Sequence, residues 1–332
     1  MSCEGRRVDI SEVGTDRVEV CGARGRRPPS TLIACALVTD GYYTSVLVFL
    51  VGRDARRKAH RLGIDFVRRA ERLLEREGFA PLRDVDIEIL GSESTYGPHS
   101  RERDTREVVV KIALHHDLHE ALAAVVRETA SFGLAVPGLS GGGTGLPKPT
   151  PLLRLQSYLV PRERIHPRIE LDGDPVPFTA SGTVEGVDAQ VAPAPEAEPF
   201  LVTDPVALPL IAIAHARSGD KGADANIGVR ARHPDFLPLL RDQLPAEAVA
   251  DWLAHRIDGP VERYELPGIH AMNFVLRNAL GGGGISSLRF DPQGKAYAQQ
   301  LLDMPLYVPA AWLFHLGIAE ITEVEEARHL WS

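Results

Sequence analysis

The segment LPLIAIAHARSGDKGADANIGVRAR, residues 208–232, decides the fold of the second half of the chain. An apolar run leads into a glycine turn, and the run NIGVRAR leaves it, which predicts a β-hairpin. Four charged side chains crowd the turn: Arg217, Asp220, Lys221 and Asp224. A solvated hairpin does not need this concentration of charge, whereas an anion-binding site or a proton-transfer site would use it.

The residues after this hairpin alternate between helix and strand patterns. Helices are predicted at PDFLPLLRDQL, PAEAVADWLAHRI and PQGKAYAQQLLDM, strands at VERYELP and HAMNFVLRNAL, and a glycine turn into a further strand at GGGGISSLRFD. This order is close to a ferredoxin-like βαβ arrangement over residues 206–305. Residues 306–332 form an apolar tail, whose stretch Trp312, Leu313, Phe314 and Leu316 we expect beyond the last element of the domain.

Residues 1–165 predict another domain, with the order β-β-α-β-β-α-β. Strand patterns at STLIACALVTD and YYTSVLVFLVG flank a predicted turn at DGYY, and a long amphipathic helix follows from Asp54 to Glu77, with Gly78 as its natural stop. One stripe of this helix is apolar and contains Ala55, Ala59, Leu62, Phe66, Ala70 and Leu73. Asp117 is the predicted cap of a second helix, and LLRLQSYLV is the final strand. This many strands beside so few helices favours a sheet with its helices on one face.

Residues 166–205 differ in composition from both domains. The stretch DGDPVPFTASGTVEGVDAQVAPAPEAEPF is rich in Pro, Ala, Gly and acidic residues and shows no periodicity, so we expect an irregular linker. The predicted fold class is therefore α+β: two α/β sandwich domains, the C-terminal one ferredoxin-like, joined by a Pro/Ala-rich linker.

The bulk composition excludes several classes of protein. A net charge of −8 over 332 residues argues against nucleic-acid binding, which needs a basic face. The helix RDARRKAHRLGIDFVRRAERLLERE is locally basic, but we read it as a solvated face. Three cysteines without a C-x-x-C pair indicate a reducing compartment. No apolar run is long enough for a signal peptide or a membrane span, so we expect a cytoplasmic protein.

Three motifs resemble the AtuA family, named for acyclic terpene utilisation in bacteria. They are ARSGDKGADANIGV, VTDGYYTSVLVFLVG and the long run VERYELPGIHAMNFVLRNALGGGGISSLRFDPQGKAYAQQLLDMPL, and EVGTDRVEVCGARG is similar to a family opening. The resemblance implies that residues 205–309 form the family's ferredoxin-fold domain and that residues 8–162 match the later part of its main domain. It also implies that the family's N-terminal α/β region is missing, so that a separate N-terminal-half subunit would complete a hetero-oligomer.

Two functions follow from the resemblance together with the charged loops. One is a subunit of an AtuA-like enzyme, a lyase (hydratase or dehydratase) or isomerase that moves a proton on a small carboxylated or CoA-linked acyl substrate. The other is a non-catalytic interaction subunit that completes the pocket of a partner chain. The sequence contains no motif for a cofactor or a metal. We therefore expect that the protein uses no cofactor and no metal.

The hairpin supplies the first set of candidate site residues. Asp220, Lys221 and, from PGIHAMNF, His270 are candidates for proton transfer. Candidates for holding an anionic substrate lie beside them: Arg217, Ser218, Gly219, Gly222, Asn226 and Asn273. The alternative is a salt-bridged hairpin with a structural histidine.

The run Gly281 to Gly284 supplies the second set. Successive glycines let a backbone approach a ligand, so that Gly282 and Gly283 amides could steady developing charge while Ser286 and Ser287 donate to a phosphate or carboxylate. A flexible hairpin or a tight backbone crossing is the alternative. The cluster His115, His116 and His119 has metal-like spacing, but the predicted cap at Asp117 argues against a metal site, and we expect these histidines to be solvated.

Overall fold

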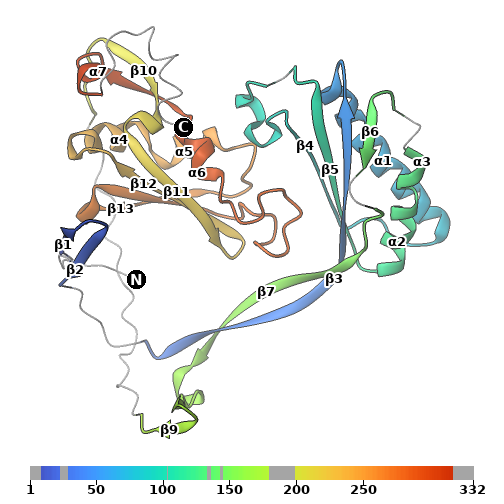
Figure 1. Cartoon of the computed structure of the whole chain (residues 1–332), viewed down its shortest axis with the longest axis horizontal. Coiled ribbons are helices and arrows are strands. Elements are labelled where there is room, and N and C mark those ends of the chain that lie inside the picture. The colour runs from blue at the N-terminus through green and yellow to red at the C-terminus, as the bar shows by residue number, and fades with distance from the viewer. Residues whose placement is uncertain are drawn as a thin grey trace. The chain divides into compact units, whose positions relative to one another are not determined.

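The computed structural model of the chain describes residues 9–22, 29–102, 104–132, 136–142, 145–178 and 199–316 (Figure 1). The chain divides into two compact units. The larger unit comprises Leu37–Leu155 with Glu196–Ser332, and the smaller comprises Met1–Ala36 with Gln156–Pro195.

The smaller unit consists of ribbons with exposed side chains. Its hairpins are β1 (Asp9–Gly14) with β2 (Arg17–Cys21), and β8 (Ile169–Leu171) with β9 (Asp174–Val176). The second hairpin is a short regular element within the segment that we expected to be a largely irregular linker. Residues 179–198 of the predicted linker lie outside the described residues, and the predicted domain boundaries stay predictions.

The first sheet of the larger unit has the strand order β4-β5-β3-β6, and all of these pairs are antiparallel. Its strands are β3 (Thr31–Val51), β4 (Asp84–Leu90), β5 (Glu107–His116) and β6 (Leu139–Gly142). The predicted turn at DGYY is wrong, because β3 is one continuous strand. The first part of β3 pairs with β7 (Thr150–Pro161), and from Tyr42 onward β3 pairs with β5. β3 therefore passes from one partner strand to the next without a turn.

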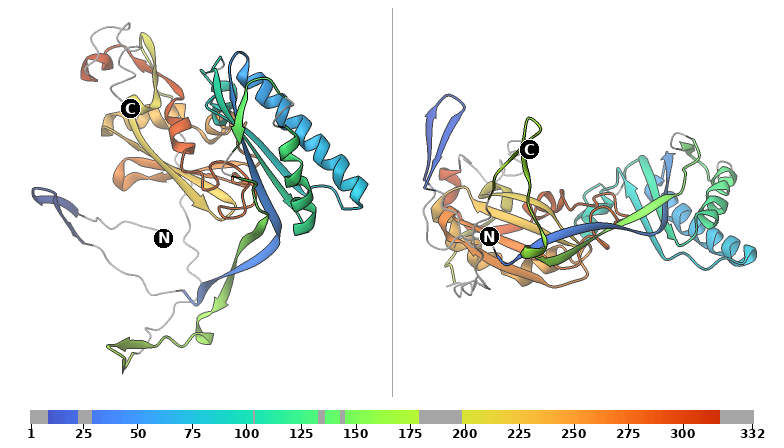
Figure 2. Two further views of the ribbon diagram at one scale, coloured as in Figure 1. Left: turned by 45° about the vertical axis from the view of Figure 1, so that its right-hand side comes forward. Right: turned by 90° about the horizontal axis from the view of Figure 1, so that it is seen from below.

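Helices cover one face of this sheet, as the amphipathic pattern predicted (Figure 2). Helix α1 (Ala55–Glu77) ends at Gly78, whose left-handed backbone lets its N–H reach the carbonyl of Glu75. The buried stripe of α1 contains the predicted residues Ala55, Ala59, Leu62, Phe66, Ala70 and Leu73. These side chains form one core with the inward side chains of β3 and β5 and with α2 (His119–Arg127), which is followed by α3 (Thr129–Phe132).

The predicted cap of α2 is wrong. Leu118 occupies the cap position, and its N–H donates to Nδ1 of His116 at 2.9 Å. Asp117 instead pairs with Arg83 at 2.8 Å. The ring of His116 thus takes the place of the expected carboxylate: its Nδ1 accepts the hydrogen bond, and its Nε2 bonds the Ala80 carbonyl.

The C-terminal domain has a four-stranded antiparallel sheet, in the order β11-β12-β14-β13. Its strands are β11 (Ala214–Lys221), β12 (Asp224–Ala231), β13 (Val261–Leu266) and β14 (Ala271–Leu276). Helices α4 (Leu237–Gln243), α5 (Ala246–Trp252) and α6 (Tyr297–Leu302) share one apolar core with the sheet. This arrangement confirms the predicted α+β class, and the opening hairpin is present with only Gly222 and Ala223 between its strands.

The segment GGGGISSLRFD is a loop and not the predicted strand. Its amides bond within the loop, from Ser286 and Ser287 to the Gly283 carbonyl, instead of to a neighbouring strand. Short 3-10 turns complete the chain: η1 (Ser94–His99), η2 (Arg162–Arg164), η3 (Leu210–Ala212), η4 (Pro234–Phe236) and η5 (Pro267–Ile269).

The apolar tail folds back on its own domain, which corrects the expectation that it lies beyond it. β15 (Pro305–Pro309) pairs with β10 (Pro205–Pro209), and α7 (Trp312–His315) follows. Leu313 is buried in the domain core, and the Trp312 ring lies 4.9 Å from the ring of Phe236. Residues 317–332 lie outside the described residues.

Candidate functional site

The loop Gly281–Asp291, hereafter the glycine segment, lies between the C-terminal sheet and the first sheet of the larger unit. It contacts the β11–β12 hairpin: a Cβ added to Gly283 would come within 3.4 Å of the Gly222 carbonyl oxygen. A Cβ on Gly284 would come equally close to a carboxylate oxygen of Asp220. The structure therefore brings together the two loops that the sequence singled out, and the positive φ of Gly283 is a backbone conformation that favours glycine.

An arginine of β7 reaches the glycine segment from the other side. Arg154 donates to the Gly282 carbonyl at 3.3 Å and forms an ion pair with Asp40 at 2.5 Å. Asp40 also accepts from Arg83 at 2.8 Å. The hydrogen bond from Arg154 is the main reason that the pKa of Asp40 lies below its usual value. Asp40 is thus a fixed anion that orients Arg154.

A cluster of charged side chains lies on the sheet face opposite α1. Lys111 of β5 pairs with Glu88 of β4 at 2.8 Å and with Asp86 at 3.5 Å. Arg256 adds a second cation 3.4 Å from Glu88, whose side chain is only 6% exposed. We call Asp86, Glu88, Lys111 and Arg256 the charge cluster.

The charge cluster holds the second half of the glycine segment through main-chain atoms. The N–H of Phe290 donates to Glu88 at 2.5 Å, and Lys111 donates to the Leu288 carbonyl. Buried charges are costly unless they are paired and hydrogen-bonded, and Glu88 and Lys111 meet both conditions here.

The two carboxyls of the charge cluster titrate differently. Burial, with the nearby Glu88 charge, raises the pKa of Asp86 from 3.8 to about 6. Burial would also raise the pKa of Glu88, but the hydrogen bond and the charge of Lys111 outweigh it and lower the pKa. Asp86 can therefore exchange a proton near neutral pH, while Glu88 stays ionised.

The predicted hairpin residues divide between the two faces of the C-terminal sheet. Asp220 and Ser218 lie on the face that packs against the helices, and Lys221, Arg217 and Gly219 alternate onto the open face. Asp220 lies 3.6 Å from the ammonium of Lys295, so a lysine that we had not singled out is its cationic partner. Lys221 is exposed and does not share its face with Asp220.

Several predicted anion-binding residues are used within the fold. The hydroxyl of Ser218 is buried, donates to the Lys295 carbonyl and accepts from the Ala298 amide. Ser286 donates to the Gly282 carbonyl at 2.9 Å, and Ser287 accepts from the Arg289 amide at 3.3 Å. These hydroxyls hold the loops in place.

Asn226 and Asn273 meet on the open face of the sheet. The Asn226 amide donates to the Asn273 carbonyl oxygen at 2.9 Å. Asp224, at the end of the same hairpin, pairs with Arg277 at 2.7 Å. The open face thus carries a polar network of its own, away from Asp220.

His270 does not join the other two predicted catalytic residues. Its carbonyl accepts from Ala231, whereas Asp220 is in register with Ala225, near the opposite end of β12. At roughly 3.3 Å per residue, about 20 Å separates His270 from Asp220. His270 is exposed, in a left-handed backbone conformation between β13 and β14.

Two of the three clustered histidines, His115 and His116 at the end of β5, are buried, which corrects our expectation that they are solvated, whereas His119 is exposed. His115 is buried and bonds the Asp40 carbonyl at 2.6 Å, and His116 is buried between Ala80 and Leu118. Among the described residues, no group of three or more His, Cys, Asp or Glu side chains could hold a metal ion.

Sequence reasoning missed the charge cluster, Arg154 and Lys295. A signal was present for three members: VDIEIL places Asp86 and Glu88 two residues apart in an otherwise apolar strand, and VVVKIAL places Lys111 in another. Charged residues that alternate with apolar residues along a strand all lie on one face of the sheet. If that face is covered, the charged side chains are buried and need partners of opposite charge. For Arg154 and Lys295 the sequence offers no comparable pattern.

The chain was compared with known proteins. Residues 2–171 match the acyclic terpene utilisation family protein AtuA, and residues 208–307 match the AtuA ferredoxin-like domain. No curated protein and no solved structure matches. Over its described part, the chain has no helix long and apolar enough to cross a membrane. Because the first match alone covers more than half of the chain, and the second adds the predicted C-terminal domain, the protein belongs to the AtuA family.

Proposed function

We propose that the chain is a subunit of an AtuA-family enzyme that transfers a proton on a small carboxylated or CoA-linked acyl substrate. The step would be a hydration, dehydration or isomerisation. One observation carries the proposal: Asp86, whose pKa lies near 6, stands beside Lys111 where the charge cluster meets the glycine segment. A carboxyl with a pKa near the working pH is suited to general acid–base catalysis.

Positive charge near the glycine segment supports an anionic substrate. Arg154 contacts Gly282, and Lys295 lies beside Asp220, which is next to Gly284. The amides of Gly282 and Gly283 donate no hydrogen bond to other described residues, so they could serve a developing oxyanion. Asp220 and Lys221, at the end of the hairpin, remain candidates for proton transfer. His270 is no longer a candidate, because it lies too far from Asp220.

Proton exchange tests the proposal without knowledge of the full reaction. The tagged chain, purified from its producing cell with whatever binds it, is incubated in D₂O with short acyl-CoA thioesters. Mass spectrometry then follows deuterium at the carbon beside the carbonyl. We expect exchange, and we expect Asp86→Asn to slow it at least a hundredfold. Asp84→Asn, on the same strand but exposed, is the matched control and should leave the rate unchanged.

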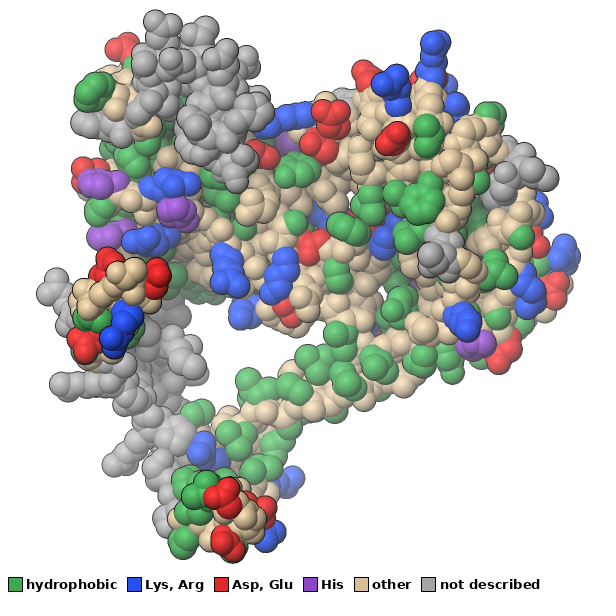
Figure 3. Space-filling view, in the orientation of Figure 1, with side chains coloured by type: hydrophobic (Ala, Val, Ile, Leu, Met, Phe, Trp, Pro, Cys, Tyr) green, Lys and Arg blue, Asp and Glu red, His purple; other side chains and the backbone are tan. Residues whose placement is uncertain are grey.

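A different feature favours the alternative of an interaction subunit. β3 and β7 form a two-stranded ribbon that carries apolar side chains on its surface (Figure 3). The exposed ones include Ile33, Leu37, Leu155, Tyr158 and Leu159. Apart from Arg154, residues 31–39 and 152–161 carry no charge. Such a ribbon is marginal alone, and a separate N-terminal-half subunit is the partner that we propose for it.

The same experiment separates the two functions. Exchange that is lost with Asp86→Asn assigns the proton transfer to this chain. Exchange that survives Asp86→Asn in a complex with a second polypeptide assigns the chemistry to that partner. A complete absence of exchange across the thioester panel, with the wild-type assembly intact, contradicts the enzymatic proposal.

A further inference from the structure

A cavity of about 790 Å³ opens beside the start of α1, on the side of the first sheet opposite the charge cluster. Its wall contains five basic side chains from two separate segments: Arg53, Arg56, Arg57, His60 and Arg106. Two carboxylates, Asp54 and Asp104, also line it. We call this space the arginine cavity. Its volume lies within the range of small-molecule sites.

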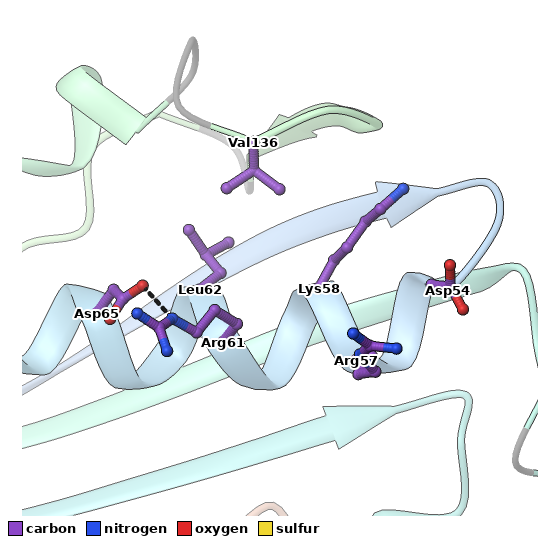
Figure 4. Close-up of a pocket in the computed structure, with 7 residues that line it drawn as sticks. All are labelled: Asp54, Arg57, Lys58, Arg61, Leu62, Asp65 and Val136. Atoms are coloured by element: carbon purple, nitrogen blue, oxygen red, sulfur yellow. Dashed lines mark hydrogen bonds and ion pairs between the residues drawn. The ribbon is translucent and has the colours of Figure 1, made fainter.

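Two carboxylates line the cavity, but within the described part of the chain neither of them is in ion-pair contact with its arginines. Among the described residues, none of Arg53, Arg56, Arg57 and Arg106 forms an ion pair, although most arginines of the same unit do. The neighbouring hollow on α1, shown in Figure 4, shares Asp54 and Arg57 with this cavity but also contains an ion pair, between Arg61 and Asp65 at 2.6 Å. The arginine cavity is therefore positively charged in a chain whose net charge is −8.

The position of these charges is also unfavourable for the helix. The first turn of α1 holds Arg56 and Arg57 and no acidic residue, and Asp54 makes no capping hydrogen bond with its side chain. Cations at the positive end of a helix dipole destabilise the helix, and a group of opposite charge beside them would offset this cost. A bound anion would do so, because it would meet both the guanidinium groups and the exposed N–H groups.

We propose that the arginine cavity binds a small molecule that carries a diphosphate. Four guanidinium groups exceed what one carboxylate can satisfy, whereas a diphosphate offers enough oxygens for several charge-assisted hydrogen bonds. Ser94 and Thr105 add hydroxyl donors, and Ile87 and Ile89 give the cavity an apolar wall. Coenzyme A, which contains a diphosphate, is one source of this chemistry, and an unconjugated diphosphate is the other. Only the link to coenzyme A rests on the function proposed above.

Calorimetric titration of the full chain at low salt tests the site without any catalytic assay. One arm uses inorganic pyrophosphate and the other uses coenzyme A. We expect the wild type to bind pyrophosphate, and Arg56→Gln/Arg106→Gln to bind it at least tenfold more weakly. The matched control is Arg72→Gln/Arg127→Gln, which removes two charges from exposed helix positions outside the cavity and should keep the affinity within twofold.

The unliganded melting temperature shows whether the variants fold. Arg56→Gln removes a cation from the positive end of α1, so the double variant should melt at the same temperature as the wild type or higher. Coenzyme A that binds more tightly than pyrophosphate supports the acyl-CoA source, and equal affinity supports a simpler diphosphate ligand. Wild type that binds neither probe, or a double variant that binds pyrophosphate as well as the wild type, overturns the proposal.

Discussion

Replacing Asp86 by asparagine should make the protein more stable at neutral pH. In the native protein, this carboxyl has a pKa of about 6 instead of 3.8, because burial and the charge of Glu88 disfavour its ionised form. This difference corresponds to roughly 3 kcal/mol in favour of the protonated form. The Asp86 side chain is 28% exposed, so water reduces the penalty, and we expect a gain of about 1 to 2 kcal/mol from the neutral amide.

The sign of the pH dependence follows from proton binding. Between about pH 4 and pH 6, folded Asp86 binds more protons than unfolded Asp86, so its contribution to stability falls as pH rises through this window. The advantage of Asp86→Asn should therefore be full at pH 8, smaller at pH 5 and absent at pH 4. At pH 8, the melting temperature should rise by about 2 to 8 °C.

Scanning calorimetry at these three pH values measures the effect. Asp84→Asn is the control, because Asp84 begins the same strand and is exposed. If Asp86→Asn lowers the melting temperature at pH 8, or shifts it equally at all three values, the raised pKa of Asp86 is refuted. A stabilised variant that has lost proton exchange would show that the carboxyl is kept for function at a cost in stability.

Two further substitutions probe how the domains are held. Lys111→Met leaves Glu88 buried with only Arg256 beside it, so urea denaturation should show a loss of about 3 to 5 kcal/mol, and adding Glu88→Gln should restore part of it. Equal stability of the single and double variants would contradict this account. Gly97→Ala would place a methyl group 2.5 Å from the His255 ring at a positive φ, so its melting temperature should fall well below that of Gly145→Ala, which has positive φ but open space.

The sequence predicted the parts of the fold that depend on local periodicity. The buried stripe of α1, the stop at Gly78 and the hairpin at Gly222 all follow from spacing within one segment. The turn predicted at DGYY failed because Gly41 has another purpose. A Cβ there would lie 2.6 Å from the His116 carbonyl oxygen, so this glycine permits a close approach of β5 within a continuous strand.

The candidate site was harder to predict because its members come from distant segments. The sequence drew attention to Asp220 and to the glycine segment, and the fold places them together. It could not show that Asp220 would face Lys295, since that pairing depends on how α6 packs beside β11. Nor could it show that His270 would lie at the far end of the sheet, because strand register decides that distance.

The contacts that anchor the glycine segment have a consequence for how relatives can diverge. Glu88 and Lys111 bind its main-chain N–H and C=O groups, and these contacts make no demand on the side chains of Leu288 and Phe290. The exposed side chains of the segment, Ile285 and Phe290, can therefore change while its anchors persist. The same freedom does not extend to Glu88 of β4 and Lys111 of β5, because replacing one of them removes an ion-pair partner of the other. Replacement is thus easier at the exposed positions of the loop than at the paired charges of the sheet beneath it.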